Sequence, residues 1–351
     1  MTFEEARAQF PVLERLAYLQ AGTTGPLARA TVAAMEAELD RDRDEGRSGK
    51  AYFESLLARR EELRAAIAEV IAVPAAHVAL TDSTTRGCAT VCAGLGLTSE
   101  DEVVTTDHEH FGLTGPLHAT GAQVVVVGAD EEALVAAVTP RTKLIATSHV
   151  LWTTGRRLDL RRLREEAGVP VLADGAQSGG AIPVDVGPVD FYTVSAQKWL
   201  CGPEATGALY VADPERLRVA SPSYLSQESY EHSGAFVPKD GARRFDSGWI
   251  PVASIAGLLA ALGTRPDWCY ERAAESAARC GELLRPLVDV VTPPGHSTLV
   301  SFHPNGDATE TVESLAAAGV IVRELPGRNL VRASCGWWTS EDDLQRLAAA
   351  L

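Results

Sequence analysis

The sequence is short of positive charge and has no long apolar stretch. Its 351 residues include 47 acidic side chains and 32 basic ones, which gives a net charge of −15. Nucleic-acid binding requires a basic surface that displaces counterions from phosphates, so this balance argues against a nucleic-acid partner. No apolar run reaches the roughly 18 residues that a membrane-spanning helix requires. We therefore expect neither nucleic acid nor a membrane to be a partner.

The usual marks of export and of a metal site are also lacking. The opening stretch, MTFEEARAQFPVLERL, carries acidic side chains and no long apolar core, unlike a signal or transit peptide. The six cysteines are scattered, as is typical of reduced thiols in the cytoplasm. Cys88 and Cys92 are close in sequence, but no second ligand pair follows them. We therefore predict a cytoplasmic protein without a metal site.

The central part of the chain alternates short β-branched runs with helical segments. This alternation predicts an α/β fold, in which a mostly parallel seven-stranded sheet is covered by helices on both faces. Two segments before it, 28–46 and 51–71, have helical spacing. The predicted strands lie at 78–82, 102–106, 123–128, 143–150, 169–175, 190–195 and 208–212.

The C-terminal part predicts a smaller companion domain. Residues 265–351 alternate helices with short strands, as in a small α+β domain, and we expect residues 1–15 to join it. The large domain then covers 16–264. Within the large domain, residues 213–247 are rich in loops and poor in apolar anchors. We expect this stretch to cover the site or to meet a partner subunit.

Polar side chains recur where the predicted strands end. In sheets of this kind, ligands bind outside the carboxyl ends of the strands. Five strand ends contribute to this rim, which is hard to explain by packing alone, so the sequence predicts a site for a small molecule. The residues concerned are Ser83, Thr84, Thr85, His110, Ser148, His149, Asp174, Ser195 and Lys198.

Lys198 and Asp174 suggest what that molecule is. A lysine can form an imine with an aldehyde, and surroundings that lower its pKa free the amine for this reaction. Asp174 follows an apolar run, where a carboxylate requires a cationic partner such as a pyridinium nitrogen. This pairing keeps the ring able to accept electrons from a substrate carbanion. We predict pyridoxal 5′-phosphate (PLP) as cofactor, with Lys198 as its Schiff-base partner; a surface lysine and a helix-capping or metal-binding aspartate are the alternatives.

Other side chains suit the remaining parts of the cofactor and the substrate. Residues 83–85 place hydroxyls at a helix N-terminus, where a phosphate binds, although a plain helix cap is the alternative. Gln177 can bind the phenolic oxygen, and His110 can lie over the ring and transfer protons; a surface glutamine and a packed or solvent-exposed histidine are the alternatives. Arg332 can hold a carboxylate through two hydrogen bonds, with Arg323 as the second choice and a surface arginine as the alternative.

These motifs resemble the class V aminotransferase family of fold-type I PLP enzymes, which includes cysteine desulfurases and isopenicillin N epimerase-like proteins. The resemblance implies that His110 stacks on the cofactor, that Ser195 contacts its phosphate and that Arg332 holds the substrate carboxylate. It also implies a homodimer. The matching segments are STT at 83–85, EHFGLTGP at 109–116, SHVLWTTG at 148–155, DGAQSGGAIPVDV at 174–186, SAQKWLCGPEATGALYV at 195–211 and VRAS at 331–334.

Departures from the family pattern bear on the reaction. Gln197 stands where many relatives have a histidine, so we expect an altered cofactor contact there. Trp152 replaces the small polar residue of many desulfurases, which suggests a reshaped substrate pocket. Trp249 occupies the position from which relatives give a hydroxyl to the neighbouring subunit's phosphate. The loop VRELPGRNLVR lacks the sulfur-carrying cysteine of desulfurases, and Cys335 is a poor substitute.

We therefore predict a PLP-dependent enzyme that acts on an amino acid or an amino-acid conjugate. The substrate amine displaces Lys198 to form an aldimine, and the freed lysine moves the Cα proton while Asp174 sustains the electron sink. Without a loop cysteine, sulfur has to leave directly, which favours C–S lyase or β-elimination chemistry. Transamination and epimerisation are the alternatives within the family. A non-catalytic binding protein on the same fold is a more distant hypothesis.

Overall fold

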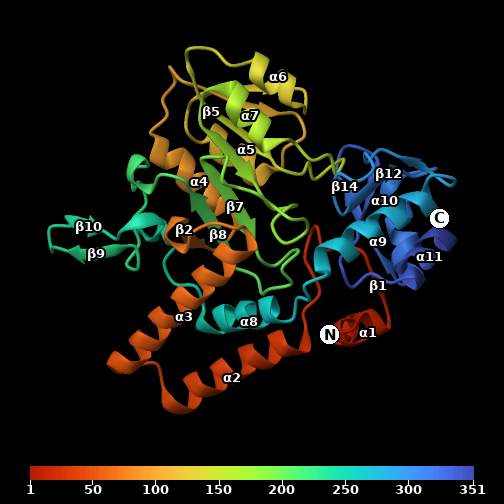
Figure 1. Cartoon of the computed structure of the whole chain (residues 1–351), viewed down its shortest axis with the longest axis horizontal. Helices are drawn as coiled ribbons and strands as arrows, with labels where there is room; N and C mark the ends of the chain where they lie inside the picture. The colour runs from red at the N-terminus through yellow and green to blue at the C-terminus, as the bar shows by residue number, and fades with distance from the viewer.

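The computed structural model describes residues 1–351. Its largest sheet has seven strands and lies at the centre of the large domain (Figure 1). The strand order is β2-β8-β7-β6-β5-β3-β4. Six strands run in the same direction, and β8 runs opposite to them. Every predicted run forms a strand, which confirms the mostly parallel α/β sheet. The strands are β2 (Val78–Thr81), β3 (Glu102–Thr106), β4 (Gln123–Val127), β5 (Thr142–Ser148), β6 (Val171–Asp174), β7 (Phe191–Ser195) and β8 (Gly207–Val211).

Helices cover both faces of this sheet because its central strands are buried on both sides. Val103 and Val104 are consecutive in β3 and enter different apolar clusters, as the two-residue period of a strand requires. One cluster includes residues of α4 (Thr84–Leu95) and α5 (Phe111–His118). The other includes residues of α3 (Gly49–Val70), α6 (Glu131–Ala136), α7 (Leu160–Ala167) and α8 (Val252–Gly263).

A long helix, α2 (Arg29–Glu45), packs along α8 below the sheet (Figure 1). It ends at Gly46, whose φ of 79° is one that residues with a Cβ rarely adopt. The bounds of α2 and α3 confirm the helices predicted at 28–46 and 51–71. None of the helices is both long enough and apolar enough to pass through a bilayer.

The C-terminal residues build a second layer around a four-stranded antiparallel sheet, β11-β12-β15-β14 (blue in Figure 1). A further strand, β1 (Ala17–Tyr18), pairs with β13 (Val320–Ile321). The other elements are α9 (Cys269–Leu284), β11 (Asp289–Val290), β12 (Leu299–His303), α10 (Ala308–Ala317), β14 (Arg323–Leu325), β15 (Leu330–Ser334) and α11 (Glu341–Ala350).

The N-terminal residues pack on this C-terminal layer. Arg7, the last residue of α1 (Phe3–Arg7), pairs with Asp343 at 2.7 Å. The Phe10 ring lies 5.4 Å from the ring of Trp337 and 5.6 Å from that of Trp338. These contacts support our proposal that residues 1–15 and 265–351 form one small domain beside the large domain at 16–264. Short 3-10 helices lie at Pro11–Glu14, Ala75–His77, Pro214–Arg216 and Gly241–Phe245.

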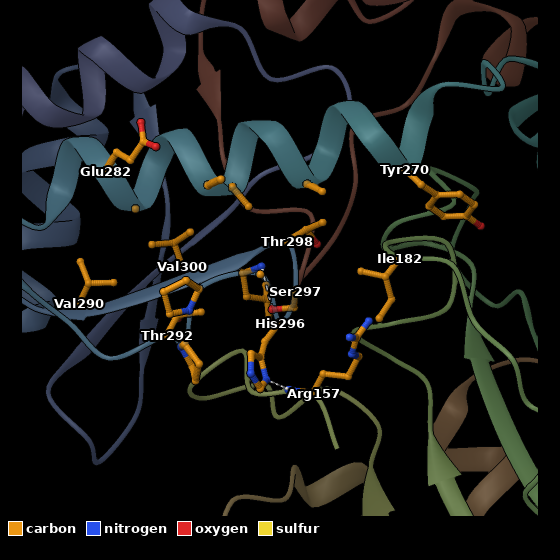
Figure 2. A pocket seen from close by; sticks show the side chains of 18 of the residues that line it. Arg157, Ile182, Tyr270, Glu282, Val290, Thr292, His296, Ser297, Thr298 and Val300 are labelled. Atoms are coloured by element: carbon orange, nitrogen blue, oxygen red, sulfur yellow. Dashed lines mark hydrogen bonds between the residues drawn. The ribbon is translucent and has the colours of Figure 1, made fainter. Parts of the chain in front are cut away.

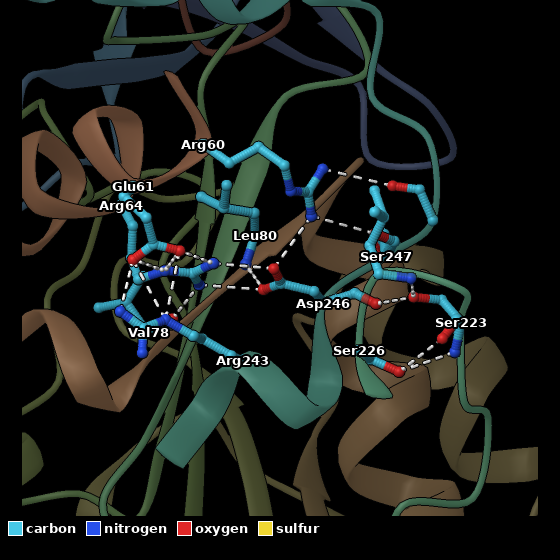
Figure 3. A network of polar contacts seen from close by, with 12 residues as sticks. Arg60, Glu61, Arg64, Val78, Leu80, Ser223, Ser226, Arg243, Asp246 and Ser247 are labelled. Atoms are coloured by element: carbon cyan, nitrogen blue, oxygen red, sulfur yellow. Dashed lines mark hydrogen bonds and ion pairs between the residues drawn. The ribbon is translucent and has the colours of Figure 1, made fainter. Parts of the chain in front are cut away.

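The stretch predicted to be rich in loops contains a β-hairpin, β9 (Gln227–Tyr230) and β10 (Phe236–Pro238), that projects from the body of the molecule (Figure 1). The loop that follows is anchored by Asp246 (Figure 3). Its carboxylate accepts hydrogen bonds from Arg60 at 3.0 Å, from Arg64 at 2.8 and 2.9 Å, and from the Leu80 N–H at 2.9 Å. All three charged side chains are buried, so this network fixes the loop that carries Trp249 against the sheet.

Candidate active site

A cavity of about 260 Å³ lies at the carboxyl ends of the parallel strands. It brings together eleven of the side chains that the sequence assigns to the cofactor and the substrate, drawn from six separate segments of the chain. Those side chains are Ser83, Thr84, Thr85, His110, Trp152, Asp174, Gln177, Ser195, Gln197, Lys198 and Arg332. The remaining lining residues are Gly22, Thr23, Ser148, Val150, Ala176 and Arg323. His149, by contrast, is buried beside the Tyr192 ring and does not line the cavity.

Lys198 follows β7 and presents an amine that forms no ion pair in the structure. Burial lowers the pKa of Lys198 to about 8; the nearby Asp174 carboxylate opposes this shift and the Arg332 charge adds to it. A substantial fraction of the amine is therefore neutral near pH 8, and only the neutral amine can attack a carbonyl carbon. The setting is that of an activated nucleophile.

Asp174 is the last residue of β6, and only 4% of its surface is exposed. Its Oδ1 accepts hydrogen bonds from Thr193 Oγ1 at 3.1 Å and from the Ala176 N–H at 2.9 Å. No basic side chain pairs with the carboxylate, and both hydrogen bonds fall on one oxygen. A buried carboxylate of this kind needs a cation, so Oδ2 is available to a positively charged ligand atom.

Hydroxyls and free N–H groups gather at the start of α4. Ser83 caps this helix by accepting a hydrogen bond from the Arg86 N–H at 3.2 Å. Thr84 and Thr85 follow in the first turn, where the helix dipole favours an anion. Ser195, at the end of β7, donates to Gln197 Oε1 at 2.7 Å. This part of the cavity suits a phosphate.

His110 and Gln177 are held by neighbouring groups. His110 caps α5, its Nδ1 accepts from the Gly112 N–H at 3.0 Å, and its ring meets the Trp152 ring edge-on at 5.3 Å. Gln177 Oε1 accepts from Trp199 Nε1 at 3.1 Å, and its Nε2 donates to the Gly22 carbonyl at 2.8 Å. Because the indole can only donate, it fixes the amide orientation and leaves one N–H of Gln177 for a ligand.

Arg332 and Arg323 face each other across the paired strands β14 and β15. Arg332 is 2% exposed, and its Nη1 donates to the Trp152 carbonyl at 2.8 Å, whereas its Nε has no partner. Burial lowers the pKa of Arg332 to about 9, and the charge of Arg323 adds to this effect. Neither guanidinium has an acidic partner, so the pair favours an anionic ligand.

Two lining residues, Gly22 and Thr23, come from the N-terminal loop and were not predicted. A Cβ at Gly22 would lie 2.8 Å from Arg332 Nη2 and 2.9 Å from Gln177 Oε1, so only glycine leaves room for both side chains. Thr23 Oγ1 lies 3.5 Å from Arg332 Nη2. No local pattern in the sequence places these two residues beside strands more than 150 residues away.

The cysteines lie outside this cavity. All six are free and buried. A hydrogen bond with Cys280 and burial raise the pKa of the Cys335 thiol well above its usual range, so it does not provide a reactive thiolate. Cys88 and Cys92 pack in the apolar layer between α4 and the sheet. No group of three or more potential ligand side chains is arranged to hold a metal ion.

A second groove, also of about 260 Å³, lies between α9, the loop before β12 and the large domain (Figure 2). It contains none of the predicted site residues. Ser297 Oγ donates to the Gly155 carbonyl at 2.7 Å, and the Arg157 N–H donates to His296 Nδ1 at 3.2 Å. These bonds fasten the C-terminal layer to the segment that follows Trp152.

The fold and these side chains define a fold-type I PLP-dependent enzyme, and comparison with known proteins agrees. The aminotransferase class-V family model matches residues 17–347. Isopenicillin N epimerase of Streptomyces clavuligerus is 28% identical, with 99% of this chain and 97% of the relative covered. A probable cysteine desulfurase of Methanothermobacter thermautotrophicus is 26% identical, with 100% and 98% covered.

Solved structures of the cystine C–S lyase C-DES are also similar. The complex of C-DES with its product cysteine persulfide has a TM-score of 0.91 at 27% identity, with 97% of this chain and 98% of that chain covered. A mutant form, which carries glycine covalently linked to the PLP cofactor, also gives a TM-score of 0.91, at 26% identity with 98% of each chain covered.

The chain therefore belongs to the aminotransferase class-V family. The predicted family, fold and classification as a PLP-dependent enzyme are confirmed. The hypothesis of a non-catalytic binding protein is left without support.

Proposed function

We propose that this enzyme is a C–S lyase whose substrate is a sulfur-containing amino acid with two carboxylates, such as cystine. The observation that carries this proposal is the pair Arg323 and Arg332, two guanidiniums without acidic partners in one cavity. One of them suffices for the α-carboxylate of any amino acid. The second favours a substrate with another carboxylate at its far end. The similarity to C-DES points the same way.

The absence of a sulfur-carrying cysteine supports direct release of the sulfur product. Leu325 pairs with Leu330, which leaves only residues 326–329 in the turn between β14 and β15. A turn of this length holds no mobile arm that could carry a thiol into the cavity. Cys335 lies beyond the turn and is fully buried. We therefore expect the sulfur fragment to leave without first being transferred to the protein.

The side chains that line the cavity provide hydrogen-bonding groups for each part of PLP. Asp174 has one oxygen free of hydrogen bonds for the ring nitrogen, and Gln177 has a free N–H for the phenolic oxygen. We propose that Lys198 holds the cofactor covalently through its amine and that His110 lies over the ring. We assign the phosphate to Ser83, Thr84, Thr85, Ser195 and Gln197.

Bound PLP supplies the electron sink that stabilises negative charge at the substrate Cα. Arg332 orients the α-carboxylate, and Arg323 holds the distal one at the rim of the cavity. Replacement of Lys198 on the cofactor by the substrate amine would free the lysine amine to take the Cα proton. The Cβ–S bond then breaks and sulfur leaves with the electron pair, while water releases the remaining carbon skeleton as pyruvate and ammonia. Trp152 walls the substrate side of the cavity and contacts His110.

A product assay on the PLP-loaded enzyme tests this function. Cystine has two carboxylates, whereas cysteine and S-methylcysteine have one each. We expect cystine to give pyruvate, ammonia and cysteine persulfide in equal amounts, with the highest kcat/KM of the three. Stoichiometric amino-group transfer that leaves pyridoxamine phosphate would establish transamination instead. An inverted α-carbon without pyruvate would establish epimerisation, the activity named for the Streptomyces relative.

We also propose that the enzyme works as a homodimer in the cytoplasm. Large aromatic side chains are exposed on the single chain: Phe111 is 80% and Trp249 is 59% exposed. Trp249 contacts Phe53 of α3 with the ring centres 6.0 Å apart, so the two form a continuous apolar surface. Light scattering should give twice the mass of the chain, and Trp249→Arg should shift the mass toward that of the monomer. Six unpaired thiols are consistent with a reducing compartment.

A further inference from the structure

His108 lies beside the site, but its role is not explained by the cofactor contacts. Arg328, in the turn between β14 and β15, reaches across to the large domain. Its Nη2 donates to the Asp107 carbonyl, and its Nη1 lies 3.4 Å from His108 Nε2. On the other side of the imidazole, Nδ1 lies 2.5 Å from Thr153 Oγ1, which is fully buried. The ring therefore bridges three segments of the chain.

The hydrogen-bonding partners of His108 determine the protonation state and the tautomer of its imidazole. A guanidinium has only donors, so Nε2 must accept the hydrogen bond from Arg328 and cannot carry a proton. The single proton of the neutral ring then lies on Nδ1 and is donated to Thr153. Protonation of Nε2 would replace an acceptor with a donor that faces a positive charge. The contact with Arg328 therefore exists only while His108 is neutral.

The three bridged segments are those that carry substrate-facing groups. His108 is two residues before His110, and Thr153 follows Trp152. The turn of Arg328 joins the two strands that carry Arg323 and Arg332. The Trp152 carbonyl accepts a hydrogen bond from Arg332, so the hairpin contacts the segment at 152–153 directly through Arg332 and indirectly through His108.

We propose that His108 and Arg328 form a clasp that holds the Arg323–Arg332 hairpin over the cavity. His108 is a positioning residue in this role, because it acts on the substrate through the two arginines. This proposal depends on the proposed function in one respect, because it takes Arg323 and Arg332 to be the residues that bind the substrate carboxylates. With the clasp closed, both guanidiniums are held where a substrate can meet them together. With it open, the hairpin moves away from the large domain and substrate affinity falls.

The charges around His108 make the clasp sensitive to pH. Burial lowers the pKa of His108; the Arg328 charge adds to this shift, and Asp107, whose Oδ1 lies 3.9 Å from Nε2, opposes it. The imidazole therefore stays neutral at neutral pH. As the pH falls through the lowered pKa, the ring becomes charged and the clasp opens.

Hydrogen exchange and kinetics on the PLP-loaded enzyme test the clasp together. His108→Leu and Arg328→Met each remove one side of it, and His118→Leu, an exposed histidine on α5, is the matched control. Backbone amides of the hairpin at 323–332 should exchange at least fivefold faster in both clasp variants than in the wild type or the control. KM for cystine should rise about tenfold with kcat changed less than twofold. The double variant should be no worse than Arg328→Met alone, because removing Arg328 already abolishes its contact with His108.

The pH profile separates this role from a purely structural one. KM of the wild type should rise as the pH is lowered through the titration of His108, and KM of His108→Leu should stay flat over the same range. Unchanged exchange and unchanged KM in both variants, or strictly additive effects in the double variant, would overturn the clasp. If cystine is not a substrate, the exchange experiment still decides the clasp, because it needs no turnover.

Discussion

Arg323 and Arg332 stand opposite each other on paired antiparallel strands, and neither has an acidic partner. Two like charges at neighbouring positions repel each other, and this repulsion helps to lower the pKa of Arg332. A bound anion reduces this repulsion between the two guanidiniums. The pair therefore bears directly on the choice of substrate.

Replacing Arg323 should change substrate preference more than catalysis. A hydrogen bond to a charged group contributes about 1.5 to 3 kcal/mol, so Arg323→Gln should raise KM for cystine by roughly 10- to 150-fold. S-methylcysteine has no distal carboxylate, and its kcat/KM should change less than threefold. Steady-state kinetics with both substrates provide the measurement. Equal losses for both substrates would mean that Arg323 does not read the distal carboxylate.

The uptake of PLP by the apoenzyme should depend on pH. Because burial lowers the pKa of Lys198 to about 8, the neutral amine increases as the pH rises through that value and is complete about two units above it. The uptake rate, followed by absorbance, should rise over the same window and then level off. The Asp174 charge opposes this lowering, so Asp174→Asn should move the midpoint to lower pH. A rate independent of pH from 6 to 9 would contradict this account.

Asp174→Asn should also separate cofactor binding from turnover. The asparagine keeps the hydrogen bonds to Oδ1 but carries no charge to hold a proton on the ring nitrogen. We expect PLP still to bind and kcat to fall by at least about a hundredfold, which corresponds to roughly 2.7 kcal/mol. Absorbance spectra report the bound cofactor, and a pyruvate assay reports kcat. Retention of more than a tenth of kcat would count against the ring-nitrogen contact.

The buried network around Asp246 should carry a large part of the local stability. Asp246→Ala leaves Arg60 and Arg64 buried without a carboxylate between them, and breaking a buried ion pair in this way costs about 3 to 5 kcal/mol. Urea unfolding of the PLP-loaded enzyme should show this loss. Asp240→Ala, at an exposed position nearby, should change the free energy of unfolding by less than about 0.5 kcal/mol. Similar values for the two variants would show that the network is not stabilising.

The amino-acid sequence by itself determined the strands of the large domain and most of the residues of the site. The seven strands followed from short β-branched runs, because a strand buried on both faces has to be apolar throughout. Lys198, Asp174 and Ser83 could be picked out because parallel strands bring their carboxyl ends to one edge of the sheet. Each of these inferences depends on local pattern plus one rule of topology.

The tertiary structure decided the relations between distant segments. The facing of Arg323 and Arg332 depends on the register of a hairpin, which a shift of one residue would abolish. Gly22 reaches the cavity, and Trp199 fixes the amide of Gln177, only because separate segments pack against one another. Nothing in the local sequence distinguishes His108, whereas the tertiary structure places Arg328 and Thr153 on either side of its ring. Local sequence specifies which groups a segment carries, whereas long-range packing sets the distances at which those groups act.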